Sequence, residues 1–181
     1  PANVVRAKAR LLRVLLAQLE ATLAGVAEYR KVVEAFFRAW PTAEVPRTLP
    51  AAHGTVVPAI WAELGDAPGR WESWQHLQAH GGAVPVTRRS GKHTSIAFRY
   101  ACNKRLRAAL HQYALVSLQH SEWARAYYDR QRDRGHPHNH ALRALGAKWL
   151  KIFFVLRTRH VPYDEDRHLA MMARQQLRRA A

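Results

Sequence analysis

The feature that most constrains this chain is a run of apolar side chains at heptad spacing over residues 3 to 40. The steps alternate between four and three residues, with one interruption at Arg30 and no proline inside the run. This pattern predicts one continuous helix, roughly 55 Å long at about 1.5 Å per residue. The apolar positions are Val5, Ala9, Leu12, Leu16, Leu19, Leu23, Val26, Val33, Phe37 and Trp40.

This helix would be longer than the width of a small domain, so its apolar seam needs another helix to pack against. If that helix comes from a second copy, the chain is a homo-oligomer through its N-terminal helix, which is the arrangement we expect. A long core helix folded against its own domain is the alternative that the spacing leaves open.

The rest of the chain predicts short helices around one β-hairpin. A proline-rich break is expected over 41–50, and hairpin arms over 84–87 and 95–100 around Ser90-Gly91-Lys92. Helices are expected over 55–64, 71–80, 103–119 (capped by Asn103), 121–134 (capped by Ser121), from Pro137 and from Asp164. The fold class is therefore mainly α, a long coiled-coil-like N-terminal helix followed by a helical domain that carries one hairpin. The expected parts are a coiled-coil helix (1–44), a domain (45–165) and a C-terminal helix or tail (166–181).

Composition narrows the class of protein. Of the 181 residues 48% are apolar, enough for a real core, and the single Cys102 excludes a disulfide framework and a cysteine-based zinc finger. No apolar run is long enough to span a bilayer and no signal peptide opens the sequence, so we expect a cytoplasmic protein without a membrane partner. Because Pro1 rather than Met comes first, we expect a piece of something longer.

Positive charge dominates and is unevenly placed. The net charge is +16 and the isoelectric point is about 11.1, which indicates a polyanionic partner such as nucleic acid. No carboxylate occurs between Glu72 and Glu122. That stretch holds Arg88, Arg89, Lys92, Arg99, Lys104, Arg105 and Arg107. A solvated basic face is the simpler alternative, but the charges flank a predicted turn, which favours phosphate binding with a steep salt dependence.

Ser90 lies at the centre of this basic stretch. Gly91 beside it would let a bulky backbone approach the hydroxyl closely, since glycine has no side chain. Guanidinium groups nearby could stabilise the added charge of a five-coordinate phosphorus as a serine attacks it. Ser-Gly is also a common turn pair, so a purely structural Ser90 stays an alternative.

Metal and hydrolase sites are poorly supported by the sequence. His138 and His140 would point to different sides of a starting helix, and no cysteine or glutamate stands at a ligand spacing from them. The one acidic cluster, residues 164–166, lies where carboxylates simply favour a helix N-terminus. We therefore expect no metal site in this chain, and no Gly-x-Ser-x-Gly nucleophile elbow occurs.

Taken in order, several motifs resemble the C-terminal half of a bacterial transposase of the insertion-sequence 110/116/902 group, which includes the Piv/MooV invertases. They are Ala59-Ile-Trp-Ala-Glu-Leu-Gly-Asp66, Gly82-Ala-Val-Pro-Val-Thr-Arg-Arg-Ser-Gly-Lys92, Phe98-Arg-Tyr-Ala-Cys-Asn-Lys-Arg-Leu-Arg107, Ala126-Tyr-Tyr-Asp129, Arg134-Gly135, Ala141-Leu-Arg-Ala-Leu145 and Tyr163-Asp164. The resemblance covers roughly residues 45 to 170. The heptad helix corresponds to the coiled coil that joins the two catalytic halves of this family. One motif departs from the pattern: where members commonly carry a Pro-Gly-Ile-Gly-type hairpin, this chain reads Leu49-Pro-Ala-Ala-His-Gly54.

The resemblance implies a mechanism. In this family a serine of the C-terminal domain forms a covalent phosphoserine link to DNA, and the matching residue here is Ser90 in Arg-Ser-Gly-Lys. The N-terminal half is a RuvC-like domain whose carboxylates bind divalent metal (Mg²⁺), and members use a bridge RNA to choose donor and target DNA. This implies DNA and a guide RNA as partners, and a place beside the bacterial nucleoid.

We therefore expect a piece of a DNA recombinase that binds nucleic acid and, without the metal-binding half, does not cleave it. Ser90 would be the nucleophile, and four cations would hold the scissile phosphate: Arg88, Arg89, Lys92 and Arg99. Neighbouring DNA or RNA backbone would be contacted by Asn103, Lys104, Arg105 and Arg107. Two alternatives remain, a non-catalytic nucleic-acid-binding module and a dimerising adaptor built on the heptad helix.

Overall fold

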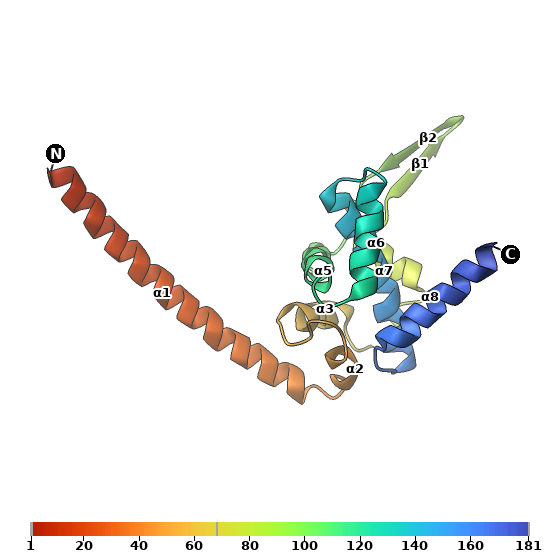
Figure 1. The fold of residues 1–181 in the computed structure, drawn as a ribbon, viewed down its shortest axis with the longest axis horizontal. Helices are drawn as coiled ribbons and strands as arrows, with labels where there is room; N and C mark the ends of the chain where they lie inside the picture. Colours follow the sequence, from red (N-terminus) through yellow and green to blue (C-terminus); the bar gives the residue numbers. More distant parts are fainter. Residues whose placement is uncertain (1, 68, 181) are drawn as a thin grey trace. The chain divides into compact units, whose positions relative to one another are not determined.

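The computed structural model describes residues 2–67 and 69–180, with side chains as far as residue 174. It divides into two compact units, Pro1–Trp40 and Pro41–Ala181. Helices and one two-stranded antiparallel hairpin make up the regular structure of the described residues (Figure 1). The predicted fold class is confirmed.

The first unit is the single helix α1 (Ala2–Ala39), as the heptad pattern predicts. The leucines of its seam are exposed, Leu16 by 54% and Leu23 by 59%, whereas Phe37 near its C-terminal end is buried. Charged residues interrupt its apolar ones, and within the described part of the chain no helix combines the length and the hydropathy needed to cross a bilayer.

The second unit holds the remaining helices. They are α2 (Glu44–Arg47), α3 (Val56–Leu64), α4 (Trp74–His80), α5 (Lys104–Ser117), α6 (Glu122–Asp133), α7 (His138–Arg159) and α8 (Glu165–Ala180). Helix α2 lies where we expected only a break. Its Pro46 is in the first turn, where a helix does not need the backbone N–H that proline lacks.

The core of this unit forms around α7, whose Trp149 and Phe153 are fully buried. The Trp149 ring packs against Tyr113 of α5 at 5.0 Å and against Trp123 of α6 at 4.7 Å between centroids. Each such side chain stabilises the fold by about 1.5–3 kcal/mol through burial. Gly146 brings α5 and α7 close together, because a Cβ there would lie 3.0 Å from the Cγ atom of Leu110.

The hairpin consists of β1 (Val86–Ser90) and β2 (His93–Ala97), joined by Gly91 and Lys92. Its existence is confirmed, but both strands lie closer to the turn than predicted, because backbone pairing does not require apolar side chains on these exposed strands. Gly91 has a φ of 56°, and Lys92 does not share the positive φ, the pattern of a type II′ turn with glycine first. The hairpin extends away from the helices of its unit (Figure 1).

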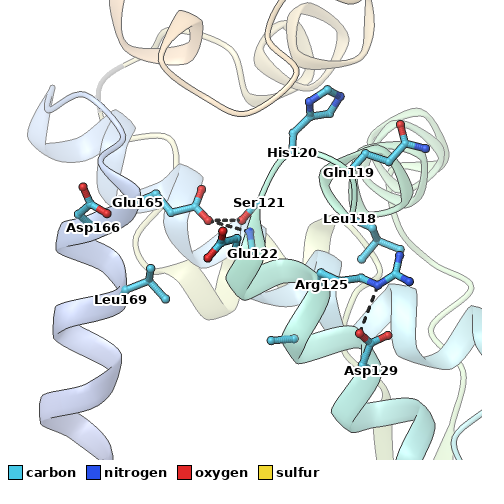
Figure 2. Close-up of a pocket in the computed structure, with 11 residues that line it drawn as sticks. Leu118, Gln119, His120, Ser121, Glu122, Arg125, Asp129, Glu165, Asp166 and Leu169 are labelled. Atoms are coloured by element: carbon cyan, nitrogen blue, oxygen red, sulfur yellow. Dashed lines mark hydrogen bonds and ion pairs between the residues drawn. The ribbon is translucent and has the colours of Figure 1, made fainter.

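The structure confirms the Asn103 cap of α5 and the N-cap position of Ser121 in α6, but not a capping bond from the Ser121 side chain. Asn103 caps α5, its Oδ1 accepting the Leu106 N–H at 3.0 Å. Ser121 does not cap α6 with its side chain; it donates instead to Oε1 of Glu165 at 2.9 Å. The same oxygen accepts the Glu122 N–H at 3.0 Å, so a carboxylate from α8 serves the α6 N-terminus (Figure 2).

The segment of residues 49–54 contains a left-handed residue. Ala51 has a φ of 57°, in the region that favours glycine, and its carbonyl accepts the Gly54 N–H at 3.4 Å. A turn of the chain is therefore kept here without glycine at its centre.

Candidate nucleic-acid interface

Ser90 is the last residue of β1, directly before the turn, and its side chain is exposed. It pairs across the hairpin with His93. The hydroxyl therefore sits at the tip of a projecting hairpin, where a bulky polymer can reach it.

The strand pleat divides the cations near Ser90. Successive side chains of a strand point to opposite faces, so Arg88 shares the face of Ser90 and Arg89 lies on the other. Lys92 belongs to the turn itself. Of the predicted cations, Arg88 therefore shares the face of Ser90, and Lys92 lies two residues beyond it in the turn.

Arg99 lies at the base of the hairpin, and the fold does not bring it to Ser90. It is six residues beyond His93, the cross-strand partner of Ser90, a distance of roughly 20 Å at about 3.4 Å per residue. Its Nε donates to the Val84 carbonyl at 3.4 Å, which ties together the two chain segments that enter and leave the hairpin.

Asn103 uses both ends of its amide inside the domain. Its Oδ1 caps α5, and its Nδ2 donates to Oε2 of Glu63 at 2.7 Å. Glu63 and Asn103 come from two of the motifs that carry the family resemblance, so those motifs are joined in space. Arg105, two residues on, is exposed in the first turn of α5.

Lys104 and Arg107 line a cavity of about 530 Å³ between α5 and α7, next to the base of the hairpin. On α5 it is lined by Lys104, Arg107, Ala108, Leu110, His111 and Gln112. On α7 it is lined by Asn139, Leu142, Arg143 and Gly146. Phe98, which directly follows β2, completes the wall toward the hairpin.

Two arginines of this cavity share one aromatic ring. The guanidinium carbons of Arg107 and Arg143 lie 5.2 Å and 5.0 Å from the centroid of Phe98. Nη1 of Arg107 is buried without a hydrogen-bond partner. Burial, followed by the charges of His138 and Arg143, lowers the pKa of His111. The convergence of Phe98, His111 and Arg143 cannot be predicted from local sequence, because it depends on how α5 and α7 pack.

A second cavity, of about 750 Å³, lies where the start of α6 meets α8 (Figure 2). Its lining includes four carboxylates, from Glu122, Asp129, Glu165 and Asp166. Such a surface repels phosphate, so we exclude it from the interface. Across the described residues, no group of three or more His, Cys, Asp or Glu side chains could hold a metal ion.

Comparison with known proteins identifies the domain that carries the hairpin. Residues 43–129, which include Ser90, Glu63 and Asn103, match the family described as Transposase IS116/IS110/IS902. The chain belongs to this transposase family. The match spans the hairpin and both motifs that the Asn103–Glu63 hydrogen bond joins.

Proteins of three insertion elements are similar to this transposase domain and the helices around it. A protein of the IS117 mini-circle of Streptomyces coelicolor is 33% identical over 157 residues, 86% of this chain and 38% of its own length. The 43.6 kDa protein of insertion element IS110 from the same organism is 28% identical, over 80% and 37% of the two chains. The 42 kDa protein of IS900 from Mycobacterium paratuberculosis is 29% identical, over 73% and 33%. The chain thus spans less than two fifths of each relative.

Proposed function

We propose that this chain is the part of a DNA transposase that forms a covalent phosphoserine link to DNA through Ser90. The observation that carries the proposal is an exposed serine hydroxyl at the tip of a hairpin, with Arg88 on its own face and Lys92 in the adjoining turn. Membership of a transposase family supplies the reaction class.

The chemistry exchanges one phosphate ester for another. Oγ of Ser90 attacks the phosphorus and loses its proton to solvent, and the bond from phosphorus to one sugar oxygen breaks. That oxygen takes up a proton and leaves as a hydroxyl. In the second step a hydroxyl of another strand attacks the phosphoserine and releases Ser90. Arg88 and Lys92 stabilise the charge that develops on the phosphate oxygens.

The proposed mechanism also uses a second domain of the full-length protein and an RNA. The family resemblance implies a Mg²⁺-binding RuvC-like half and a guide RNA. Among the residues that the structure describes, no group of three or more His, Cys, Asp or Glu side chains could hold that metal ion. The chain by itself binds nucleic acid, as its net charge of +16 supports, and does not cleave it. A second copy pairs with it along the exposed seam of α1.

Ser90→Ala in the full-length transposase tests the nucleophile. A labelled element end is incubated with the protein, and DNA-linked protein is counted on a denaturing gel. We expect the covalent adduct and the recombinant product to fall at least ~1,000-fold, because no other group replaces the hydroxyl. Binding of the same DNA should change less than about twofold.

Ser95→Ala is the matched control, because Ser95 lies on the same face of the hairpin, opposite Arg88. It should keep both adduct and recombination. If Ser90→Ala recombines as well as Ser95→Ala does, Ser90 is only a turn residue. The chain would then be a non-catalytic binding module.

A further inference from the structure

We propose that the cavity between α5 and α7 binds a backbone phosphate of an unpaired nucleic-acid strand. The inference rests on the proposed nucleic-acid-binding function and assigns it a second site, away from the hairpin tip. Its central residues are Arg107 and Arg143, which face the ring of Phe98.

The shape of the cavity follows from the packing of two helices. Gly146 lets α7 approach Leu110 of α5 closely. Toward the start of each helix the gap between them is lined by longer side chains, Lys104 and Arg107 on α5 and Arg143 on α7. Three cations from two helices therefore line one cavity.

The charges in the cavity are not balanced from within. Its lining, as far as the structure describes it, contains no aspartate or glutamate. Both guanidinium groups lie over the same aromatic ring, an arrangement that leaves their N–H donors free for an oxygen ligand. The buried Nη1 of Arg107 lacks a hydrogen-bond partner, and a buried donor left unpaired is costly. A phosphate supplies the negative charge that this lining lacks and oxygen acceptors for guanidinium N–H groups.

An exposed aromatic ring beside the cavity favours an unpaired strand. Tyr100 is 78% exposed, and its ring meets Phe98 edge to face at 5.0 Å between centroids. Exposed aromatic side chains next to cations are typical of proteins that stack the bases of single strands. Paired bases are already stacked within a duplex, so Tyr100 discriminates between the two forms.

The bound phosphate is not the one that Ser90 attacks. Phe98 is five residues beyond His93, which places the cavity roughly 17 Å from the hairpin tip at about 3.4 Å per residue. An unpaired strand of several nucleotides spans this separation. The cavity therefore holds the strand in register while the tip acts on it.

The test compares Arg143→Ala with Lys148→Ala, an exposed cation on the same helix that does not line the cavity. Binding of this chain to a fluorescein-labelled 20-nucleotide single strand and to its duplex is followed by anisotropy over a range of salt. Arg143→Ala should weaken single-strand binding about tenfold and lower the salt slope by about 0.7, the value for one phosphate contact. Lys148→Ala should change binding less than about twofold.

Tyr100→Ala provides a second readout, which a merely electrostatic patch would not give. It should weaken single-strand binding about fivefold or more and leave duplex binding unchanged. Thermal melting verifies that each variant folds. If Arg143→Ala does not fold, Lys104→Ala, in the exposed first turn of α5, takes its place with the same expectation.

The outcomes separate this inference from the proposed function. If the wild-type chain binds neither oligonucleotide, both fail. If it binds but Arg143→Ala behaves as Lys148→Ala does, the cavity is not a site and the proposed function stands. Equal losses of single-strand and duplex binding in Tyr100→Ala would overturn the preference for an unpaired strand.

Discussion

Asn103 joins two helices whose contact residues are 40 positions apart in the sequence. One end of its amide caps α5 and the other donates to the Glu63 carboxylate of α3. The cap follows from local sequence, because it links residues three apart. The hydrogen bond to Glu63 cannot be predicted from local sequence, since a contact across 40 residues depends on the fold. The role of Asn103 in joining α3 to α5 therefore emerges only from the structure.

Replacing Asn103 separates stability from binding at the scale of one residue. Asn103→Ala should lower the free energy of unfolding by about 2–3 kcal/mol, because it removes a helix cap and a hydrogen bond to a carboxylate. Urea denaturation measures this loss. The affinity of the folded variant for a single strand should stay within about twofold of the wild type.

Asn103→Asp is the comparison variant, since it keeps the capping oxygen but faces Glu63 with a second carboxylate. Its loss of stability should come mainly from that repulsion and should shrink when Glu63→Gln is added. A direct contact with nucleic acid would instead appear as weaker binding by Asn103→Ala at unchanged stability.

The elements of this chain differ in how far the sequence predicts them. Helix α1 could be predicted almost to the residue, because a heptad pattern without proline indicates one continuous helix. The hairpin could be predicted from its turn but not its strand ends, since exposed strands carry no inside–outside alternation. The prediction that the Ser121 side chain caps α6 was wrong, because the capping carboxylate comes from Glu165, 43 residues beyond Glu122.

The seam of α1 predicts self-association. The double variant Leu16→Asp with Leu23→Asp places charge in the apolar seam, where a partner helix would bury it, so a dimer should become a monomer. Light scattering coupled to size-exclusion chromatography measures the mass. Gln18→Asp with Gly25→Asp has the same seven-residue spacing on the opposite side of the helix, where a Cβ at Gly25 meets nothing within 4 Å. It should keep the wild-type mass; equal behaviour of the two double variants would contradict pairing through the seam.

At the scale of the whole molecule, the net charge follows directly from composition. The sequence predicts the candidate site only in part. The serine and the basic stretch around it are contiguous in sequence, so the tip could be found there. The cavity needs cations from residues 104, 107 and 143 to meet around Phe98, and that convergence is set by the packing of α5 on α7. Local spacing also groups Arg99 with Ser90, whereas an extended hairpin separates its base from its tip.

Buried histidines govern how the stability of the whole molecule responds to acid. Burial lowers the pKa of His168, whose ring packs on Trp123 at 4.7 Å, and it also lowers those of His80 and His111. In the unfolded chain these histidines return to an ordinary pKa of about 6.5 and bind protons more readily than in the fold. The free energy of unfolding should therefore be highest above about pH 6.5 and should fall as the pH drops from there through the folded pKa values of these histidines.

Urea titrations from about pH 7.5 to 5 measure this decline in the free energy of unfolding, and His168→Phe should make the decline shallower. Protonation also adds to self-repulsion in a chain of net charge +16, but about 0.5 M salt screens that part and leaves the burial effect. Equal slopes for wild type and His168→Phe in high salt would mean that charge repulsion alone, and not the buried imidazole, drives the loss of stability in acid.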